Sequence, residues 1–452
     1  MGEILHAREA LLPDGWAADV AVEIEDGRIA SVTPGVAGSK TSLAVLLPSP
    51  GNLHSHAFQR AMTGLTEART AGRDSFWTWR TLMYRFLEQL TPEDVEAIAA
   101  QVYVEMLEAG YAAVGEFHYL HHAPGGAAYR NPAEMSAAIA TAAADTGIGL
   151  THLPVLYMRG GTDDRALEGG QLRFGCTLDR FQTLLEGAEK EVARAGPDAV
   201  TAVAAHSLRA VGVEALTDAA QMRPDGPFHI HIAEQEAEVA DVLATHGATP
   251  VKWLLEIMDV GPRWCLIHAT HMTPAEVRGL GESGAVAGLC PITEANLGDG
   301  IFEGAAYRAS GGRFGVGSDA NVRIALAEEL RTLEYGQRLR DRARSVLAGP
   351  GSTGRALFEA ACSGGAQALG RGAGAIRAGE WADLVALDGD ALALAGLGGD
   401  TRLDAWLFAG DDTLVRDVWS AGRHMVRDGR HVGRGPVEVR FREVLARLRA
   451  DL

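Results

Sequence analysis

Two histidines separated by one residue, His54 and His56, have the spacing of a metal site. Alternate residues of a β-strand point to the same side, so two imidazoles at this spacing can bind one ion. His231 and Asp319, far along the chain, supply a third nitrogen and one oxygen. This ligand set suits Zn²⁺, and it also accepts Fe²⁺ or Mn²⁺. We therefore expect one divalent metal ion, with Zn²⁺ preferred.

The chemistry expected of such an ion is hydrolysis. A divalent metal lowers the pKa of a bound water to about 7, which generates hydroxide at neutral pH. Glu234, three residues after His231, is placed to take the proton of the water and pass it to a leaving nitrogen. An alternative interpretation of Glu234 is a carboxylate that stabilises the start of a helix. His268 is expected to hydrogen-bond the hydroxide or the tetrahedral centre, and Asp319 to share the proton transfer.

The elements that must position these residues are short apolar runs that alternate with longer helical patterns, as in parallel β/α units. Eight such runs fit an α/β (β/α)8 barrel better than an open sheet, and no G-x-G-x-x-G motif follows a strand to support a dinucleotide-binding fold. The helical patterns include residues 92–109, 132–145, 178–195 and 234–246. The predicted strands end at Leu53, Phe117, Leu156, Ala205, Ile230, Ile267, Leu289 and Val316.

Functional side chains of a barrel collect where its strands end. Seven histidines and three acids lie in or just after the predicted strand ends, and we expect them to converge on one rim. These residues are His54, His56, Glu116, His118, His206, His229, His231, Glu234, His268 and Asp319. Among them, His229 is expected to pack behind the site, and no functional role is assigned to His118.

The two ends of the chain differ from its middle. Short alternating strands flank the tight-turn pairs Asp26-Gly27 and Asp428-Gly429. Two β-rich ends around a different middle predict a small discontinuous β-sandwich domain formed by both termini. We expect this domain to comprise residues 1–49 and 371–452, and the catalytic barrel to comprise residues 50–370.

Composition excludes several classes of partner. Lys+Arg 41 against Asp+Glu 59 gives a net charge of −18. Nucleic acids and anionic membranes need a positive surface, so neither is expected as a partner. No apolar run approaches the ~18 residues of a membrane span. The four cysteines form no C-x-x-C pair, which is typical of a reduced cytoplasmic protein.

Several segments resemble the formimidoylglutamate deiminases, a family of the amidohydrolase superfamily, and the resemblance covers essentially the whole chain. The most discriminating are F-W-T-W-R, preceded by Ser75, and T-E-A-N-L-G-D-G at residues 293–300. The others are P-G-N-L-H-S-H-A-F-Q-R from residue 50, G-E-F-H-Y from 115, A-H-S-L-R from 205, H-I-H-I-A-E-Q from 229 and G-S-D from 317.

This resemblance implies a zinc enzyme that converts N-formimino-L-glutamate and water to N-formyl-L-glutamate and ammonia in histidine degradation, and it implies a homodimer. By this resemblance, metal is bound by His54, His56, His231 and Asp319, and the reaction is assisted by Glu234 and His268. Substrate contacts are assigned to Gln59, Arg80, Tyr119, His206 and Arg209. A dicarboxylate substrate accounts for the arginines, since a guanidinium can bind a carboxylate through two hydrogen bonds.

The lysine content supports a single metal ion. Binuclear amidohydrolases commonly bridge two ions with a carboxylated lysine at the end of the fourth strand. Here Lys190 and Lys252 lie in helical patterns, and the fourth predicted strand ends with His206. Cys290-Pro291 has no second cysteine nearby, which excludes the zinc deaminases with P-C-x-x-C ligands.

Two alternatives remain at the level of sequence. A deaminase of the same architecture that acts on a ring amidine, such as guanine, cytosine or an s-triazine, would need an aromatic stacking wall and little carboxylate recognition. The pair Arg80 and Arg209 argues against it. A catalytically silent scaffold barrel would be expected to have lost metal ligands, whereas every expected ligand is present.

Overall fold

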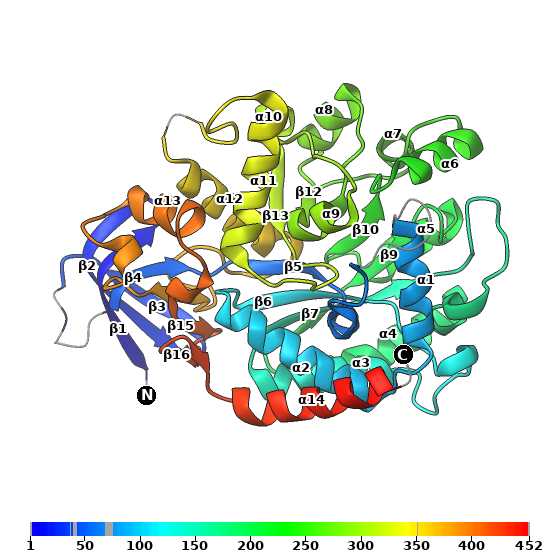
Figure 1. The fold of residues 1–452 in the computed structure, drawn as a ribbon, viewed down its shortest axis with the longest axis horizontal. Coiled ribbons are helices and arrows are strands. Elements are labelled where there is room, and N and C mark those ends of the chain that lie inside the picture. The colour runs from blue at the N-terminus through cyan, green and yellow to red at the C-terminus, as the bar shows by residue number, and fades with distance from the viewer. Residues whose placement is uncertain (1, 37, 39–42, 68–75, 350, 451–452) are drawn as a thin grey trace.

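The computed structural model describes residues 2–36, 38, 43–67, 76–349 and 351–450. Ser75, which precedes the tryptophan-containing motif, lies outside the described residues. A barrel surrounded by helices stands beside a smaller β unit, and the N-terminus lies in that unit while the C-terminus lies at the barrel, at the end of the last helix (Figure 1). Among the described residues, no helix combines the length and the apolar character needed to cross a membrane.

The predicted parallel barrel is confirmed. Its strands, in the order in which they pair, are β5 (Gly51–Ser55), β6 (Ala113–His118), β7 (Gly149–Leu156), β9 (Val203–Ser207), β10 (Phe228–Ile232), β11 (Trp264–His268), β12 (Val286–Leu289) and β13 (Arg313–Val316). A two-residue strand, β8 (Val200–Thr201), pairs with β7. Each predicted strand end lies within two residues of the observed end.

The first and last strands of the barrel meet beyond β13, at Ser55 and Asp319. The backbone N–H of His56 donates to the carbonyl of Asp319 at 2.9 Å, and the N–H of Asp319 donates to the carbonyl of His54 at 3.0 Å. Gly317 allows this approach, because a Cβ at that position would lie 2.7 Å from the backbone of His54. The seam of the barrel is therefore also the place where three predicted metal ligands meet.

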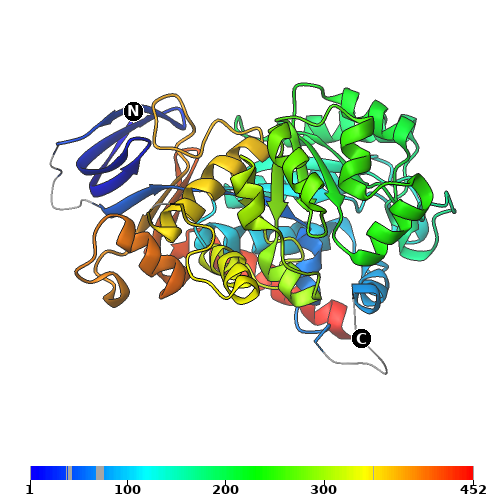
Figure 2. The same cartoon turned by 90° about the horizontal axis from the view of Figure 1, so that it is seen from above.

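Helices cover the outside of the barrel, as the view from above shows (Figure 2). The helix α2 illustrates how the sequence sets their starts: the Thr91 side chain accepts from the Asp94 N–H, Asp94 accepts in return, and Pro92 occupies the first turn. The helices are α1 (Phe76–Leu87), α2 (Pro92–Glu108), α3 (Glu134–Thr146), α4 (Leu178–Val192), α5 (Val213–Met222), α6 (Glu236–His246), α7 (Pro250–Ile257), α8 (Pro274–Ser283), α9 (Pro291–Leu297), α10 (Gly304–Ala309), α11 (Leu326–Asp341), α12 (Thr353–Ala368), α13 (Asp400–Phe408) and α14 (Arg434–Ala450).

The second β unit, predicted from both termini, is confirmed. Its strands pair in one continuous order, β17-β16-β15-β14-β4-β1-β2-β3, and only β1 and β4 pair in parallel. The sheet folds over a core of its own, to which Val22, Leu46 and Trp419 contribute. The strands are β1 (Glu3–Leu12), β2 (Gly15–Glu25), β3 (Arg28–Thr33), β4 (Leu43–Pro48), β14 (Leu384–Leu387), β15 (Val415–Ser420), β16 (Arg423–Arg427) and β17 (Arg430–His431).

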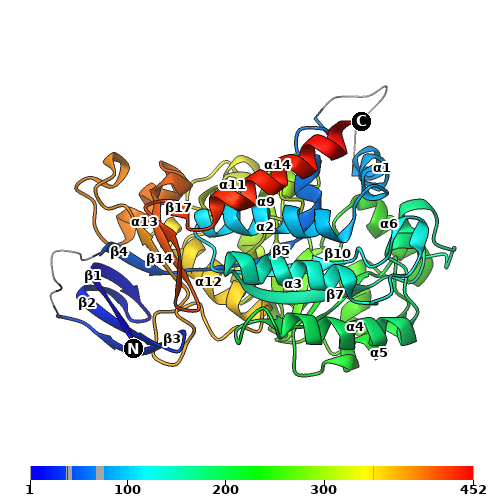
Figure 3. The same cartoon turned by 90° about the horizontal axis from the view of Figure 1, so that it is seen from below.

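The last helix leaves this β unit and returns to the barrel. In Figure 3, α14 runs alongside α2 on the outside of the barrel. Arg440 pairs with Glu96, and Arg447 pairs with Asp94. The division into residues 1–49, 50–370 and 371–452 stays a prediction, and α14 ties the last of these segments to the barrel.

A buried ion network also joins the two parts, at the end of the barrel where the strands begin. Arg371 donates to Asp383 at 2.5 and 3.0 Å and to Asp198 at 2.9 Å, and its guanidinium packs beside Gly149 at the start of β7. Arg423, from the β unit, donates to both carboxylate oxygens of Asp198 at 2.8 Å. We call Arg371, Asp198, Asp383 and Arg423 the basal network.

Candidate active site

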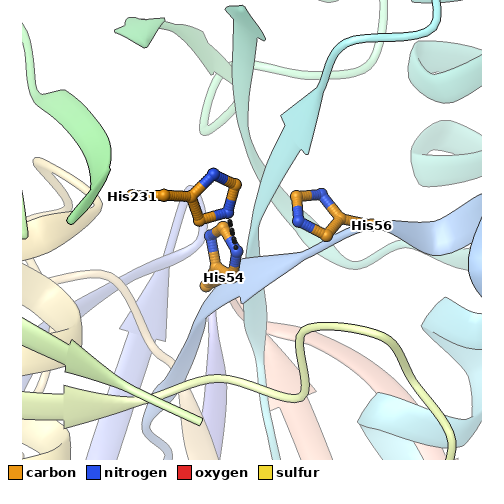
Figure 4. Close-up of side chains that lie close together, drawn as sticks. All are labelled: His54, His56 and His231. Carbon is orange, nitrogen blue, oxygen red and sulfur yellow. Dashed lines mark hydrogen bonds between the residues drawn. The ribbon is translucent and has the colours of Figure 1, made fainter. Parts of the chain in front are cut away.

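Three histidines from two strands face one point at the opposite end of the barrel (Figure 4). His54 lies in β5, His56 directly after it, and His231 in β10. One ring nitrogen from each lies within 4.8 Å of the other two. The Nε2 atoms of His54 and His231 are 3.1 Å apart, close to the ~3.3 Å that tetrahedral geometry gives two nitrogens bound to one Zn²⁺.

The other ring nitrogens explain why the Nε2 atoms face inward. His56 Nδ1 lies 2.8 Å from the Phe117 carbonyl, and His231 Nδ1 lies 3.0 Å from the His206 carbonyl. A carbonyl only accepts, so each Nδ1 carries the proton and each Nε2 presents its lone pair to the centre. Burial lowers the pKa of His54 to about 3 and also lowers the pKa values of His56 and His231. Neutral imidazoles with converging lone pairs fit a metal ion.

Asp319 completes the predicted ligand set. Its Oδ1 lies 3.3 Å from His56 Nε2 and 3.5 Å from His54 Nε2. The backbone of Asp319 has φ +47°, a strained conformation for a residue other than glycine. A hydrogen-bond pair between Ser318 and Asn52 of β5, at 2.7 and 3.1 Å, anchors this strained turn.

Glu234 and His268 lie beside this centre at the ends of β10 and β11. The preceding residue Ala233 has φ +52° and His268 has φ +70°, so strained backbone again marks the site. His268 Nε2 lies 3.9 Å from Asp319 Oδ2, and its Nδ1 lies 3.3 Å from Glu294 Oε1. Burial raises the pKa of Glu234 above its ordinary value, so this carboxyl group is suited to accept and release a proton.

Burial alone would lower the pKa of His268. The carboxylates of Glu234, Glu294 and Asp319 outweigh burial and raise it. His268 therefore holds a proton and can donate a hydrogen bond to an oxygen bound at the centre.

The centre opens into a cavity of about 570 Å³, which includes its mouth. His54 lies beneath it, and all other predicted site residues line it: His56, Gln59, Arg80, Tyr119, His206, Arg209, His231, Glu234, His268 and Asp319. The remaining lining residues are Trp79, Met83, Tyr84, Tyr157, Phe174, Thr293, Leu297 and Ala320. The structure thus brings together every residue that was predicted to bind metal, act on water or bind substrate.

The predicted substrate-binding residues come from several elements. Gln59 lies in the 3-10 helix η1 (Ala57–Met62) and donates to the Tyr119 hydroxyl at 2.8 Å. Arg80 lies in α1 and donates through Nε to the Tyr84 hydroxyl at 2.5 Å. His206 lies next to the last residue of β9, where its ring packs against Tyr157 with the ring centres 4.6 Å apart, and Arg209 follows that strand. Cationic and hydroxyl groups therefore face the same cavity as the predicted metal ligands.

Three members of the predicted rim point away from this cavity, so the prediction that all ten converge is wrong. Glu116 contacts the Ala57 N–H at 2.8 Å and the Tyr103 hydroxyl at 3.3 Å, because its strand position faces the outer helices. His118, on the same side of β6, bonds the Leu120 carbonyl. His229 lies one layer deeper than His231 and bonds the Ala368 carbonyl, as expected for a packing residue.

Sequence reasoning missed Tyr84, Tyr157 and Glu294. The i, i+4 spacing of Arg80 and Tyr84 on one helix is a signal that could have found Tyr84. Glu294 belongs to the T-E-A-N-L-G-D-G motif, and its carboxylate accepts from the Cys290 N–H at 2.8 Å while it contacts His268. No pattern in the sequence singles out Tyr157.

Comparisons with known proteins agree with this geometry. The model of the Amidohydrolase family matches residues 45–425, and that of "Formimidoylglutamate deiminase HutF, N-terminal domain" matches residues 2–40. A formimidoylglutamate deiminase from Pseudomonas aeruginosa is 50% identical over 450 residues, which cover 98% of this chain and 99% of that protein.

Solved structures of other proteins share the fold of this chain. An amidohydrolase from Brucella melitensis superposes with a TM-score of 0.95 and 49% identity over 99% of both chains. A zinc-bound adenosine deaminase from Xanthomonas campestris shares the fold, with a TM-score of 0.82 and 21% identity over 99% of this chain and 98% of its own. The chain belongs to the amidohydrolase family and, within it, to the formimidoylglutamate deiminases.

Proposed function

We propose that the protein hydrolyses N-formimino-L-glutamate to N-formyl-L-glutamate and ammonia. The observation that carries this proposal is one cavity that holds the centre of three histidines and Asp319 together with Arg80 and Arg209. A protein of net charge −18 gains from fixed cations where a dicarboxylate must bind. The 50% identity to a formimidoylglutamate deiminase over nearly the whole chain supports the same substrate.

His54, His56, His231 and Asp319 would hold the metal ion, and we propose Zn²⁺. When bound, such an ion supplies Lewis-acid activation of water. The chain itself orients two of these ligands, His56 and His231, through the Phe117 and His206 carbonyls, which fix the tautomers of their imidazoles.

Proton transfer is assigned to Glu234, with His268 beside it. Glu234 takes a proton from the water as the water oxygen bonds to the amidine carbon, which leaves one carbon attached to an oxygen and two nitrogens. Glu234 then delivers this proton to the terminal nitrogen of the protonated amidine, the bond from that nitrogen to carbon breaks, and ammonia departs. Asp319 takes the second water proton from the oxygen as the carbonyl of the formyl product forms. His268 donates a hydrogen bond to the oxygen, and the carboxylates around it maintain its proton.

The choice of leaving group follows from how the glutamyl part is bound. Arg80 and Arg209 bind the two carboxylates, while Tyr119, Gln59 and His206 add hydrogen bonds. Binding at both carboxylates holds the glutamyl nitrogen away from Glu234, so the terminal nitrogen receives the proton.

A ring amidine is the second candidate substrate, because the cavity wall contains the aromatic rings of Trp79, Tyr84, Tyr157 and Phe174. Two arginines in the same cavity match the two negative charges of a dicarboxylate, whereas guanine and cytosine carry no negative charge. The aromatic wall instead offers hydroxyl groups from Tyr84 and Tyr157, which suit carboxylates.

The test is ammonia release from a substrate panel with the zinc-loaded protein. We expect rapid release from N-formimino-L-glutamate, slower release from N-formimino-L-aspartate, and none above background from guanine or cytosine. N-formyl-L-glutamate should accumulate in equal amount to ammonia. Preference for either base, or release of glutamate in place of ammonia, would contradict the proposal, and absence of bound metal in the purified protein would favour a scaffold.

We also propose a homodimer in the cytoplasm. Four free, buried cysteines are consistent with a reducing compartment. Light scattering coupled to size-exclusion chromatography should give twice the mass of the 47.7 kDa chain, and a value equal to one chain would exclude the dimer.

A further inference from the structure

Three tyrosine hydroxyls in the cavity share one arrangement. Each accepts a hydrogen bond from a neighbouring donor: Tyr84 from Arg80 Nε at 2.5 Å, Tyr119 from Gln59 Nε2 at 2.8 Å, and Tyr157 from Gln171 Nε2 at 3.1 Å. A tyrosine oxygen that accepts in this way still has its own O–H to donate. The cavity therefore presents hydroxyl protons, which suit an anionic ligand.

Of the three tyrosines, Tyr84 has the hydroxyl group that is best placed to donate a hydrogen bond to a ligand. The O–H of Tyr119 has the sulfur of Met83 as a weak acceptor at 3.8 Å, whereas the described residues offer the Tyr84 O–H no hydrogen-bond acceptor. Tyr84 lies one helical turn after Arg80 on α1, so both side chains extend from the same face of the helix into the cavity.

The ring of Tyr84 is held in place by a residue without a side chain. Gly170, in the 3-10 helix η3 (Gly169–Arg173), faces the ring so closely that a Cβ there would lie 2.9 Å from ring carbons Cγ and Cδ1. The Arg80 guanidinium lies 5.0 Å from the centre of the same ring. Glycine at position 170 thus makes room for a ring that keeps its hydroxyl beside Arg80.

The charge state of the hydroxyl agrees with a donor role. Burial raises the pKa of Tyr84 to about 12, so the hydroxyl keeps its proton at neutral pH. The charges of Arg80 and Arg209 both act on this group, which places it in the field of the two predicted carboxylate-binding cations.

We propose that Tyr84 is a further substrate-binding residue, whose hydroxyl donates a hydrogen bond to the substrate carboxylate that Arg80 binds, and that Gly170 positions it. This inference rests on the proposed function, because it takes the dicarboxylate as the ligand. Arg80 and Tyr84 then bind the same carboxylate together: the guanidinium supplies the positive charge, and the hydroxyl orients the carboxylate.

Tyr84→Phe removes the hydroxyl and keeps the ring that Gly170 accommodates. With N-formimino-L-glutamate, KM should rise about 10-fold, the usual cost of one hydrogen bond to a charged group, while kcat stays within about twofold. Tyr335→Phe, at a partly exposed tyrosine on α11, is the matched control and should leave both constants unchanged. An unchanged KM in Tyr84→Phe would overturn the proposal.

Binding of the product separates this inference from the proposed function. Calorimetry with N-formyl-L-glutamate and its two monoamides, at the α- and the γ-carboxyl group, needs no turnover. The roughly 10-fold loss in Tyr84→Phe should become clearly smaller with one monoamide, whose neutral amide oxygen accepts a weaker hydrogen bond, and persist with the other. Equal losses of affinity for all three ligands would contradict the proposed hydrogen bond between Tyr84 and the carboxylate. A wild-type protein that binds the product but releases no ammonia contradicts only the proposed function.

Two more variants distinguish direct contact from an effect through Arg80. In an Arg80→Gln background, Tyr84→Phe should still weaken product binding by about threefold or more, whereas no further loss would mean that Tyr84 only positions Arg80. Gly170→Ala should raise KM by displacing the ring, and Gly261→Ala, where a Cβ meets nothing within 4 Å, should not. Equal KM values in the two alanine variants would overturn the role of Gly170.

Discussion

The barrel carries a cluster of buried polar groups at each end, and the two differ in how completely their members are paired. In the basal network, Arg371 binds both Asp198 and Asp383 while Arg423 binds Asp198, and the two positive charges balance the two negative charges. At the other end, the Nε2 atoms of His54 and His231 lie 3.1 Å apart, and the Nδ1 of His54 has no hydrogen-bond partner among the described residues.

The difference separates what holds the fold from what performs chemistry. A closed network has no capacity for a ligand, and breaking it leaves a buried charge without its partner. The cluster around His54, His231 and Asp319, which we call the open cluster, is held by backbone carbonyls and strained turns. It retains buried atoms with no partner in the described part of the chain, such as His54 Nδ1 and Gln59 Oε1. Changes to the open cluster should therefore lower the enzymatic activity, and changes to the basal network should lower the stability of the fold.

Removal of the metal ion should give the largest effect. Dialysis against a chelator is expected to lower ammonia release by more than about 10⁴-fold, because water then lacks Lewis-acid activation. Added Zn²⁺ should restore the rate, while far-ultraviolet circular dichroism stays unchanged throughout. Full activity at less than one metal ion per hundred chains would contradict the assignment of the open cluster.

Glu234→Gln should lower kcat by about 10³-fold, because the amide cannot carry the proton from water to the leaving nitrogen. Metal content, measured by atomic absorption, should remain at one ion per chain, since Glu234 is not a predicted ligand. A rate close to that of the wild type would remove Glu234 from the reaction.

Arg371→Met should act on the other cluster. It leaves Asp198 and Asp383 buried with less positive charge, so the free energy of unfolding should fall by about 3 kcal/mol, while kcat of the folded protein stays within about twofold. Urea unfolding followed by fluorescence measures the change. Arg377→Met, at an arginine whose side chain is 61% exposed, is the control and should cost less than about 1 kcal/mol.

A pH titration of stability gives the smallest effect. Burial alone would raise the pKa of Asp198, but the hydrogen bonds from Arg423 and the charge of Arg371 outweigh it and lower the pKa. A lowered folded-state pKa contributes stability above the unfolded value of about 3.9, and that stability is lost as the pH falls through the folded value. The melting temperature of Asp198→Asn should therefore fall less steeply below pH 4 than that of the wild type; parallel curves would mean that Asp198 is not ionised.

The sequence predicts the barrel, and the meeting of the four predicted metal ligands, for a physical reason. Buried parallel strands are short apolar runs, and the residues that follow them are brought to one rim by the closure of the barrel. His231 and Asp319 could therefore be placed beside the pair His54 and His56 although they lie far from it in the sequence. The resemblance to formimidoylglutamate deiminases added Arg80, which spacing alone did not single out.

What the sequence did not predict depends on direction and close packing. Glu116 and His118 sit at a predicted strand end, yet both lie on the opposite side of β6 from Phe117, whose ring contacts His54 and His231. The alternation of side chains along a strand predicts that Glu116 and His118 lie on one side and Phe117 on the other. It does not predict which of the two sides faces the cavity. The need for glycine at position 170 becomes visible only when the Tyr84 ring is in place.

The seam between Ser55 and Asp319 has a consequence for the order in which the enzyme matures. The fourth ligand arrives with the last strand of the ring, and the same residue forms the backbone hydrogen bonds that join that strand to the first. A growing polypeptide that ends before β13 has three imidazoles but neither the carboxylate nor the closed ring. Closure of the barrel and completion of the predicted ligand set thus depend on the same residue, so a chain that ends before β13 has only part of the predicted metal site.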